Sequence, residues 1–153
     1  MSNFDSRPDT YAHMQLVQRN LGVMIRDLLH RAEVHDHSKL SEPELSAYND
    51  MGTRLREVEY GSDEYRAILR SQKPAIKHHY AQNSHHPEHY PDGIKGMNLL
   101  DVLEMLCDWE AAARRYDNHA RASMEHNQER FGFSDELKAI LLNTLPLIEG
   151  NNE

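Results

Sequence analysis

Histidine and aspartate occur in this chain in an arrangement that suits metal binding. There are 11 histidines among 153 residues, and five of them fall between His78 and His89. Further upstream, His35 and Asp36 are adjacent near the end of a predicted helix. Imidazole nitrogens and carboxylate oxygens suit borderline divalent ions. Clustered imidazoles repel one another when charged, so we expect some of them to be neutral and available as ligands.

Two other positions extend this set. His13 lies 22 residues before His35, at the edge of an apolar helical stripe, where a single histidine is more often a hydrogen-bonded core residue. Asp108 has small or apolar residues three and four positions away, so its carboxylate needs a metal or an arginine as partner. Asp101 lies on the same helix face, but its spacing from Asn98 also fits a capping box. We therefore favour Asp108 as a ligand and leave Asp101 as a cap or an outer partner.

The order of these residues resembles a known signature. His13, then His35-Asp36, then Asp108 resembles the H…HD…D signature of the HD superfamily of metal-dependent phosphohydrolases. AEVHDHSKL is similar to that family's second-helix motif, in which HD, two variable residues and a lysine follow one another; here the lysine is Lys39. HHPEHYPDGIKG is similar to a segment of the HD-GYP phosphodiesterases, although the G-Y-P triplet is missing. The pattern H-H-Y-x-x-N-x-H-H-P-E, followed by MNLLDVLEMLCDW, also resembles a group of phage and bacterial HD-like domains.

This resemblance covers about residues 10 to 120 and implies a set of metal ligands. It implies a first ion held by four residues: His13, His35, Asp36 and Asp108. It implies a second ion, bridged to the first by Asp36, that is held by histidines from the middle of the chain: His79 with one or both of His85 and His86. The preference for His79 over His78 is weak. The cofactor would be one or two divalent transition ions, and such ligands suit Mn, Fe, Co, Ni and Zn alike.

The resemblance also implies an enzyme, a phosphohydrolase acting on a nucleotide or a related phosphoester. The ions would acidify a water for attack on phosphorus, beside the catalytic Asp36, and neutralise charge on the phosphoryl oxygens. Lys39 would contact a phosphate oxygen, unless it is a solvated lysine at a helix end. Glu88 would be a general acid or an outer partner of His85 or His86.

Two other functions stay open. Some HD-fold proteins with extra histidine ligands bind two irons and use oxygen on a small organic substrate, and this ligand set suits that chemistry too. In the third interpretation the metal is structural, and the domain is a non-catalytic regulatory or binding module. Arg114 and Arg115 are further candidates for holding phosphate, although a surface salt bridge is the commoner outcome for such arginines.

Helices must position these residues. Helical periodicity is frequent and β-branched runs are absent, so we expect an all-α fold. The resemblance makes it a single-domain bundle of the HD type, with about five to six helices over residues 1–153 and flexible ends at 1–8 and 149–153. The predicted helices are 9–31, 41–58, 62–80 with a break at Pro74, 98 to beyond 115, and 134–148. The second starts at a capping-box spacing, Ser41 and Glu44.

Composition narrows the class of partner. The net charge of −8 and the pI of about 5.7 exclude the basic stripe of a duplex nucleic-acid binder, so we expect a small phosphorylated substrate instead. One cysteine and no long apolar run predict a cytoplasmic protein with no membrane association. Ile140, Leu141 and Leu145 in the last predicted helix serve either a homodimer or the core.

Overall fold

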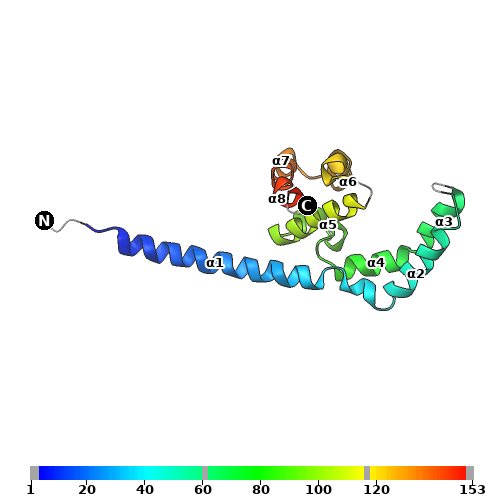
Figure 1. Ribbon diagram of the computed structural model, residues 1–153, viewed down its shortest axis with the longest axis horizontal. Helices are drawn as coiled ribbons and strands as arrows, with labels where there is room; N and C mark the ends of the chain where they lie inside the picture. The colour runs from blue at the N-terminus through cyan, green and yellow to red at the C-terminus, as the bar shows by residue number, and fades with distance from the viewer. Residues whose placement is uncertain (1–3, 60–61, 116–117, 151–153) are drawn as a thin grey trace. The chain divides into compact units, whose positions relative to one another are not determined.

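The computed structural model describes residues 4–59, 62–115 and 118–150, which form helices joined by turns (Figure 1). No strand occurs among these residues, so the predicted all-α fold is confirmed. The chain divides into two units, Met1–Val34 and His35–Glu153. The predicted single domain of the HD type stays a prediction.

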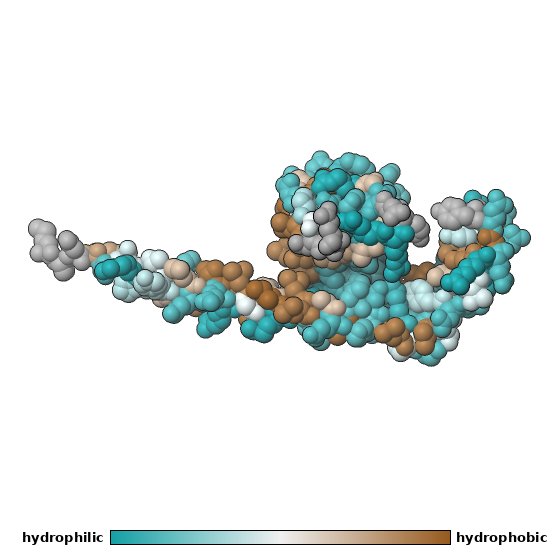
Figure 2. All heavy atoms as spheres, viewed as in Figure 1, coloured by the Kyte–Doolittle hydropathy of each residue, from teal (hydrophilic) through white to brown (hydrophobic). Residues whose placement is uncertain are grey.

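The first unit is one long helix, α1 (Arg7–Val34). It begins two residues before the predicted start at Asp9, and the Asp5 carboxylate accepts a hydrogen bond from the Arg7 backbone N–H. Figure 2 shows hydrophobic side chains on the surface of this helix. Because the unit contains no second helix to pack against, α1 has no buried residue.

The second unit begins with three α-helices that follow a short 3₁₀ helix (His37–Leu40): α2 (Glu44–Leu55), α3 (Asp63–Ser71) and α4 (Lys73–Gln82). Helix α2 contacts both α3 and α4. Ser62 caps α3 by accepting a hydrogen bond from the Tyr65 N–H. The predicted break near Pro74 is confirmed, because this proline lies in the first turn of α4, where its missing N–H costs no helical hydrogen bond.

The predicted capping box at Ser41 and Glu44 is wrong. Helix α2 begins at Glu44 itself, and no side chain caps it. The Ser41 hydroxyl donates to the Ser38 carbonyl instead, and the Glu44 carboxylate is fully buried against histidines of α4. The S-x-x-E spacing therefore marks a buried acid in this chain and not a helix cap.

The rest of the second unit surrounds the hydrophobic core. Two 3₁₀ helices (Pro87–His89 and Gly93–Gly96) lead to α5 (Leu99–Arg114). A further 3₁₀ helix (Ala120–Ser123) follows, and then come α6 (Met124–Phe131), α7 (Asp135–Thr144) and α8 (Pro146–Glu149). Helix α6 was not predicted because its sequence, MEHNQERF, is mostly polar. The predicted helix 134–148 is divided into α7 and α8, since Pro146 starts a new helix.

The core decides one open question about the last helices. It consists of buried residues from the second half of the chain: Ile94, Val102, Met105, Leu106, Ala120, Met124, Phe133, Leu141 and Leu145. Leu141 and Leu145 therefore serve the core, whereas Ile140 is exposed. Within the described part of the chain, no helix combines the length and the apolar character needed to cross a membrane.

Candidate metal centre

The His35-Asp36 pair lies where the chain turns after Val34. Asp36 has a φ of 57° and a ψ of 14°, in the left-handed region that non-glycine residues seldom adopt. The turn brings the side chains of two adjacent residues to one place, which a continuing helix would point about 100° apart. His35 Nε2 lies 3.6 Å from Asp36 Oδ2 and 3.7 Å from Asp108 Oδ1. These three residues form the first group of potential ligands.

A second group shares Asp36 with the first. Asp36 Oδ1 lies 3.2 Å from His79 Nε2 and 3.6 Å from His85 Nε2. His79 Nε2 is 2.9 Å from His86 Nε2. One potential ligand atom from each of these four residues lies within 4.8 Å of all the others. The two carboxylate oxygens of Asp36 therefore face two different groups, as expected for a bridging ligand. We call the six residues the His/Asp cluster: His35, Asp36, His79, His85, His86 and Asp108.

Neighbouring carboxylates fix the orientation of the imidazoles. Glu104 Oε1 lies 2.9 Å from His35 Nδ1 and 3.1 Å from His85 Nδ1. An ionised carboxylate only accepts hydrogen bonds, so both Nδ1 atoms carry the proton and donate. Their Nε2 atoms face the interior of the cluster, where a bound ion would take the place of any proton that they carry. One oxygen atom of α5 thus orients one histidine from each group, in the manner of carboxylate–histidine–metal triads.

Glu44 has the same function for α4. Its Oε2 lies 2.9 Å from His79 Nδ1, and its Oε1 lies 2.7 Å from His78 Nδ1. The Ser38 hydroxyl also donates to Oε2. Burial raises the pKa of Glu44, but hydrogen bonds from His78 and His79 outweigh it, and the net pKa is lowered. Glu44 therefore stays an ionised acceptor inside the protein, which fixes His79 with its Nε2 towards Asp36.

Two polar atoms of the cluster have unmet hydrogen-bonding capacity. His85 Nε2 and Asp36 Oδ1 are both buried, and neither has a hydrogen-bond partner among the described residues. A buried polar atom without a partner costs free energy, so such atoms call for a ligand or a water. Both belong to the second group, and a bound cation would satisfy them together.

The protonation states of two histidines in the cluster also favour a bound cation. Burial and the neighbouring His85 and His79 lower the pKa of His86 to about 3, which leaves that imidazole neutral. Hydrogen bonds to Asp108 and Glu104 raise the pKa of His35 to about 10, so a proton is held between carboxylates there. The cluster therefore attracts positive charge at the first group and presents the neutral His86 at the second.

The structure places the members of two pairs, left open by the sequence, in different surroundings. His79 is buried and joins the cluster, whereas His78 is turned to Glu44. Asp108 joins the cluster, whereas Asp101 completes the capping box of α5 by accepting from the Asn98 N–H.

Three other predicted site residues have different surroundings. Lys39 Nζ donates to Asp36 Oδ2, so its charge lies at the first group. Glu88 accepts a hydrogen bond of 2.7 Å from Arg130, while the carboxylates beside the Nδ1 atoms of the cluster are those of Glu44 and Glu104. His13 lies on α1 in the other unit, and its role as a ligand stays a prediction.

Glu104 and Glu44 were missed by the sequence analysis, although one signal was present. Glu104 lies four residues before Asp108, so the two acids share a face of α5. Glu44 gave no such signal, because its spacing from Ser41 already had an explanation as a cap.

A cleft of about 810 Å³ opens beside the cluster. The first group is open to this cleft, since His35, Asp36 and Asp108 are on its wall. The rest of its lining is mixed, with two cationic residues among several apolar ones: His37, Lys39, Leu40, Tyr48, Met51, Ala111, Ala112 and Arg115.

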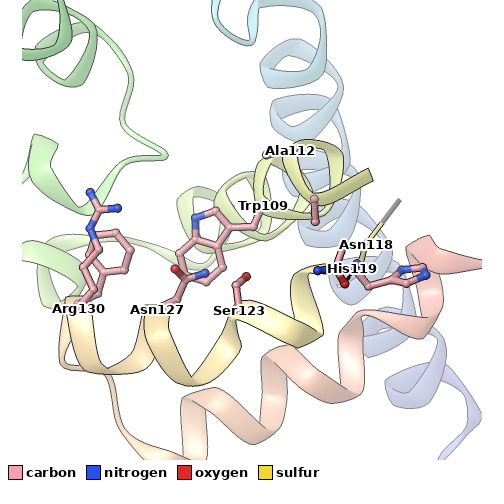
Figure 3. Close-up of a pocket in the computed structure, with 9 residues that line it drawn as sticks. Trp109, Ala112, Asn118, His119, Ser123, Asn127 and Arg130 are labelled. Atoms are coloured by element: carbon pink, nitrogen blue, oxygen red, sulfur yellow. Dashed lines mark hydrogen bonds between the residues drawn. The ribbon is translucent and has the colours of Figure 1, made fainter. Parts of the chain in front are cut away.

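A second hollow, of about 320 Å³, lies between α5 and α6 (Figure 3). Trp109 from α5 and Asn127 and Arg130 from α6 line it, and His119 lies at its other end. Arg130 is paired with Glu88. His119 is paired with Glu110, and this hollow lacks the converging ligand atoms of the His/Asp cluster.

Fold and site define an all-helical protein with a convergent set of histidine and carboxylate atoms. A family model described as "Family of unknown function (DUF5662)" matches residues 2–147. The chain belongs to this family, and the match includes residues of both units. Comparison with curated proteins and with solved structures found no match.

Proposed function

We propose that this chain is a metal-dependent phosphohydrolase with two metal positions that share Asp36. The observation that carries the proposal is the pair of ligand groups facing the two oxygens of one carboxylate. Three imidazole nitrogens with a carboxylate oxygen suit divalent transition ions. The donor set and the two unsatisfied buried atoms fit such ions.

The chain's own residues have distinct tasks in this proposal. Glu104 and Glu44 hold the imidazoles in the tautomer that offers Nε2 to the ions. Lys39 places a positive charge beside the first group, where it would contact a phosphoryl oxygen. Bound divalent ions supply an acidified water and neutralise charge on the phosphoryl group. The cleft leaves the first group accessible to a small phosphoester.

The motif order supports this reaction class over a non-catalytic module. His35-Asp36, Lys39 and Asp108 follow the HD-superfamily pattern that the sequence resembles, and the structure brings the side chains of these residues together. His13 would complete the first ligand set by the same resemblance.

Phosphate release tests the proposal. The purified, untagged protein would be loaded with Mn²⁺ or Co²⁺ and given a panel of nucleotides and simple phosphoesters. We expect release that depends on added metal and is lost in Asp108→Asn, with Asp92→Asn, in an exposed turn, as the matched control. Iron content with oxygen consumption would instead favour the oxygenase. Loss of fold on chelation, without turnover of any compound, would favour the structural role.

A further inference from the structure

The cleft beside the cluster follows one face of α5. Asp108, Ala111 and Arg115 all line it, and their spacing of three or four residues places them on the same side of the helix. Arg115 has helical backbone angles, so this geometry extends to it. Seven residues correspond to a rise of roughly 10 Å. A ligand lying along this face would therefore meet a metal ligand at one end and a guanidinium at the other.

The two neighbouring arginines differ in what they contact. Arg114 donates to Glu110 Oε1 at 2.9 Å and to the Glu149 carbonyl at 3.2 Å, so its guanidinium is engaged. Arg115 lines the cleft, and within the described part of the chain it has no ion pair or side-chain hydrogen bond. Lys39, the other cation of the cleft, is paired with Asp36 at the metal end. Arg115 is therefore the cation that remains for a ligand at the far end.

The space between the two ends is apolar. Ala111 and Ala112 form a low surface on α5, and Leu40, Tyr48 and Met51 also line the cleft. Methyl groups leave room that larger side chains would fill. These residues separate the metal end of the cleft from Arg115.

We infer that Arg115 forms a second anion subsite, and that the substrate is a phosphoester with a second anionic group beyond an apolar spacer. This inference rests on the proposed function, which places the first phosphoryl group at the metal end. The second group is a carboxylate or another phosphate, both of which a guanidinium binds through paired hydrogen bonds.

Binding of non-hydrolysable probes tests the subsite without turnover. Benzylphosphonate has one anionic group, and 4-carboxybenzylphosphonate and p-xylylenediphosphonate add a carboxylate or a phosphonate across the ring. Calorimetry on the Mn²⁺-loaded full chain should show that one of the two-anion probes binds about tenfold more tightly than benzylphosphonate, or about 1.4 kcal/mol. The better of the two identifies the second group.

Arg115→Gln should remove this tenfold gain while leaving benzylphosphonate binding unchanged, and Arg115→Lys should keep part of it. Arg114→Gln is the matched control and should keep the whole gain. Equal binding of all three probes to the wild type, no binding of any, or the same loss in both glutamine variants would overturn the inference. A tenfold gain together with no phosphate release from any phosphoester would leave the subsite standing and contradict the hydrolase.

Discussion

Two clusters in the second unit place a buried glutamate against a histidine, and they differ in what remains unsatisfied. Glu110 accepts from the His119 ring and from Arg114, both at 2.9 Å, and from the Ala120 N–H. Both of its oxygens have partners, and one partner is a permanent cation. At the His/Asp cluster, Glu44 and Glu104 contact histidine Nδ1 atoms. The histidine Nε2 atoms have no such partner and converge with the aspartate oxygens of the cluster.

This difference separates a structural contact from a candidate binding site made of the same residue types. Three residues of the other cluster also place potential ligand atoms within 4.8 Å of one another: Glu110, His119 and Glu149. However, Arg114 already neutralises Glu110, and the Ala120 N–H fills its other oxygen. In the His/Asp cluster, by contrast, buried ligand atoms without partners lie beside several carboxylates. A buried ligand atom without a hydrogen-bond partner is therefore better evidence for a binding site than the mere proximity of ligand residues.

Metal loading should give the largest difference between the two clusters. A ligand present at 1,000 times its Kd stabilises the native state by about 4 kcal/mol. We therefore expect Mn²⁺ or Zn²⁺ to raise the melting temperature of the wild type and EDTA to reverse the change. His119→Ala should keep the full metal-induced shift, and His79→Ala should lose most of it. Differential scanning fluorimetry with and without metal measures this, and an equal shift in both variants would remove the distinction.

The buried glutamates should then separate the two metal positions. Glu104 orients a histidine of each group, whereas Glu44 orients His79 alone within the cluster. Loss of such an outer partner typically weakens metal binding by about 10- to 100-fold. Glu104→Gln should weaken both binding steps in a competition titration with a chelating dye, and Glu44→Gln should weaken one. Identical titrations for the two variants would contradict this assignment.

The Glu110 cluster should affect stability without affecting metal. Burial raises the pKa of Glu110, but hydrogen bonds from Ala120, His119 and Arg114 outweigh it and lower the net pKa. Its contribution is therefore complete above the ordinary value of 4.5 and is lost as the pH falls through the lowered value. Glu110→Gln should lower the free energy of unfolding by about 2 kcal/mol at pH 7 and by less at pH 3.5.

Urea titrations of Glu110→Gln and wild type at both pH values measure this difference. Unchanged metal content in the variant is the control. A stability difference that grows as the pH falls would show that the sign of this pKa shift is wrong.

The smallest effect is expected at Glu88. Its ion pair with Arg130 is half-exposed, with 30% and 51% of the two side chains accessible. Such pairs are screened by solvent and contribute less than about 1 kcal/mol. Glu88→Gln should therefore change neither metal content nor phosphate release by more than about twofold. A large loss of phosphate release would favour the predicted role of general acid for Glu88.

Sequence alone indicated the residues of the His/Asp cluster better than the carboxylates that hold them. The histidine run and the His35-Asp36 pair stand out by composition, and α5 was predicted from its apolar periodicity and the Asn98 cap. The choice of Asp108 over Asp101 came from local helical spacing. Glu44 was assigned to a cap because its contact with His79 joins residues 35 positions apart, which no local pattern encodes. Helix α6 was missed because it has few apolar residues to give a periodicity.

Metal stoichiometry of Asp36→Asn tests the central claim most directly. The account predicts two equivalents of transition metal in the wild type by elemental analysis and fewer than one in Asp36→Asn. It also predicts one remaining equivalent in His86→Ala, which removes a ligand from the second group only. Circular dichroism would confirm that the variants are folded. Full metal content in Asp36→Asn, or none in a folded wild type dialysed against Mn²⁺ or Zn²⁺, would contradict the shared-carboxylate site.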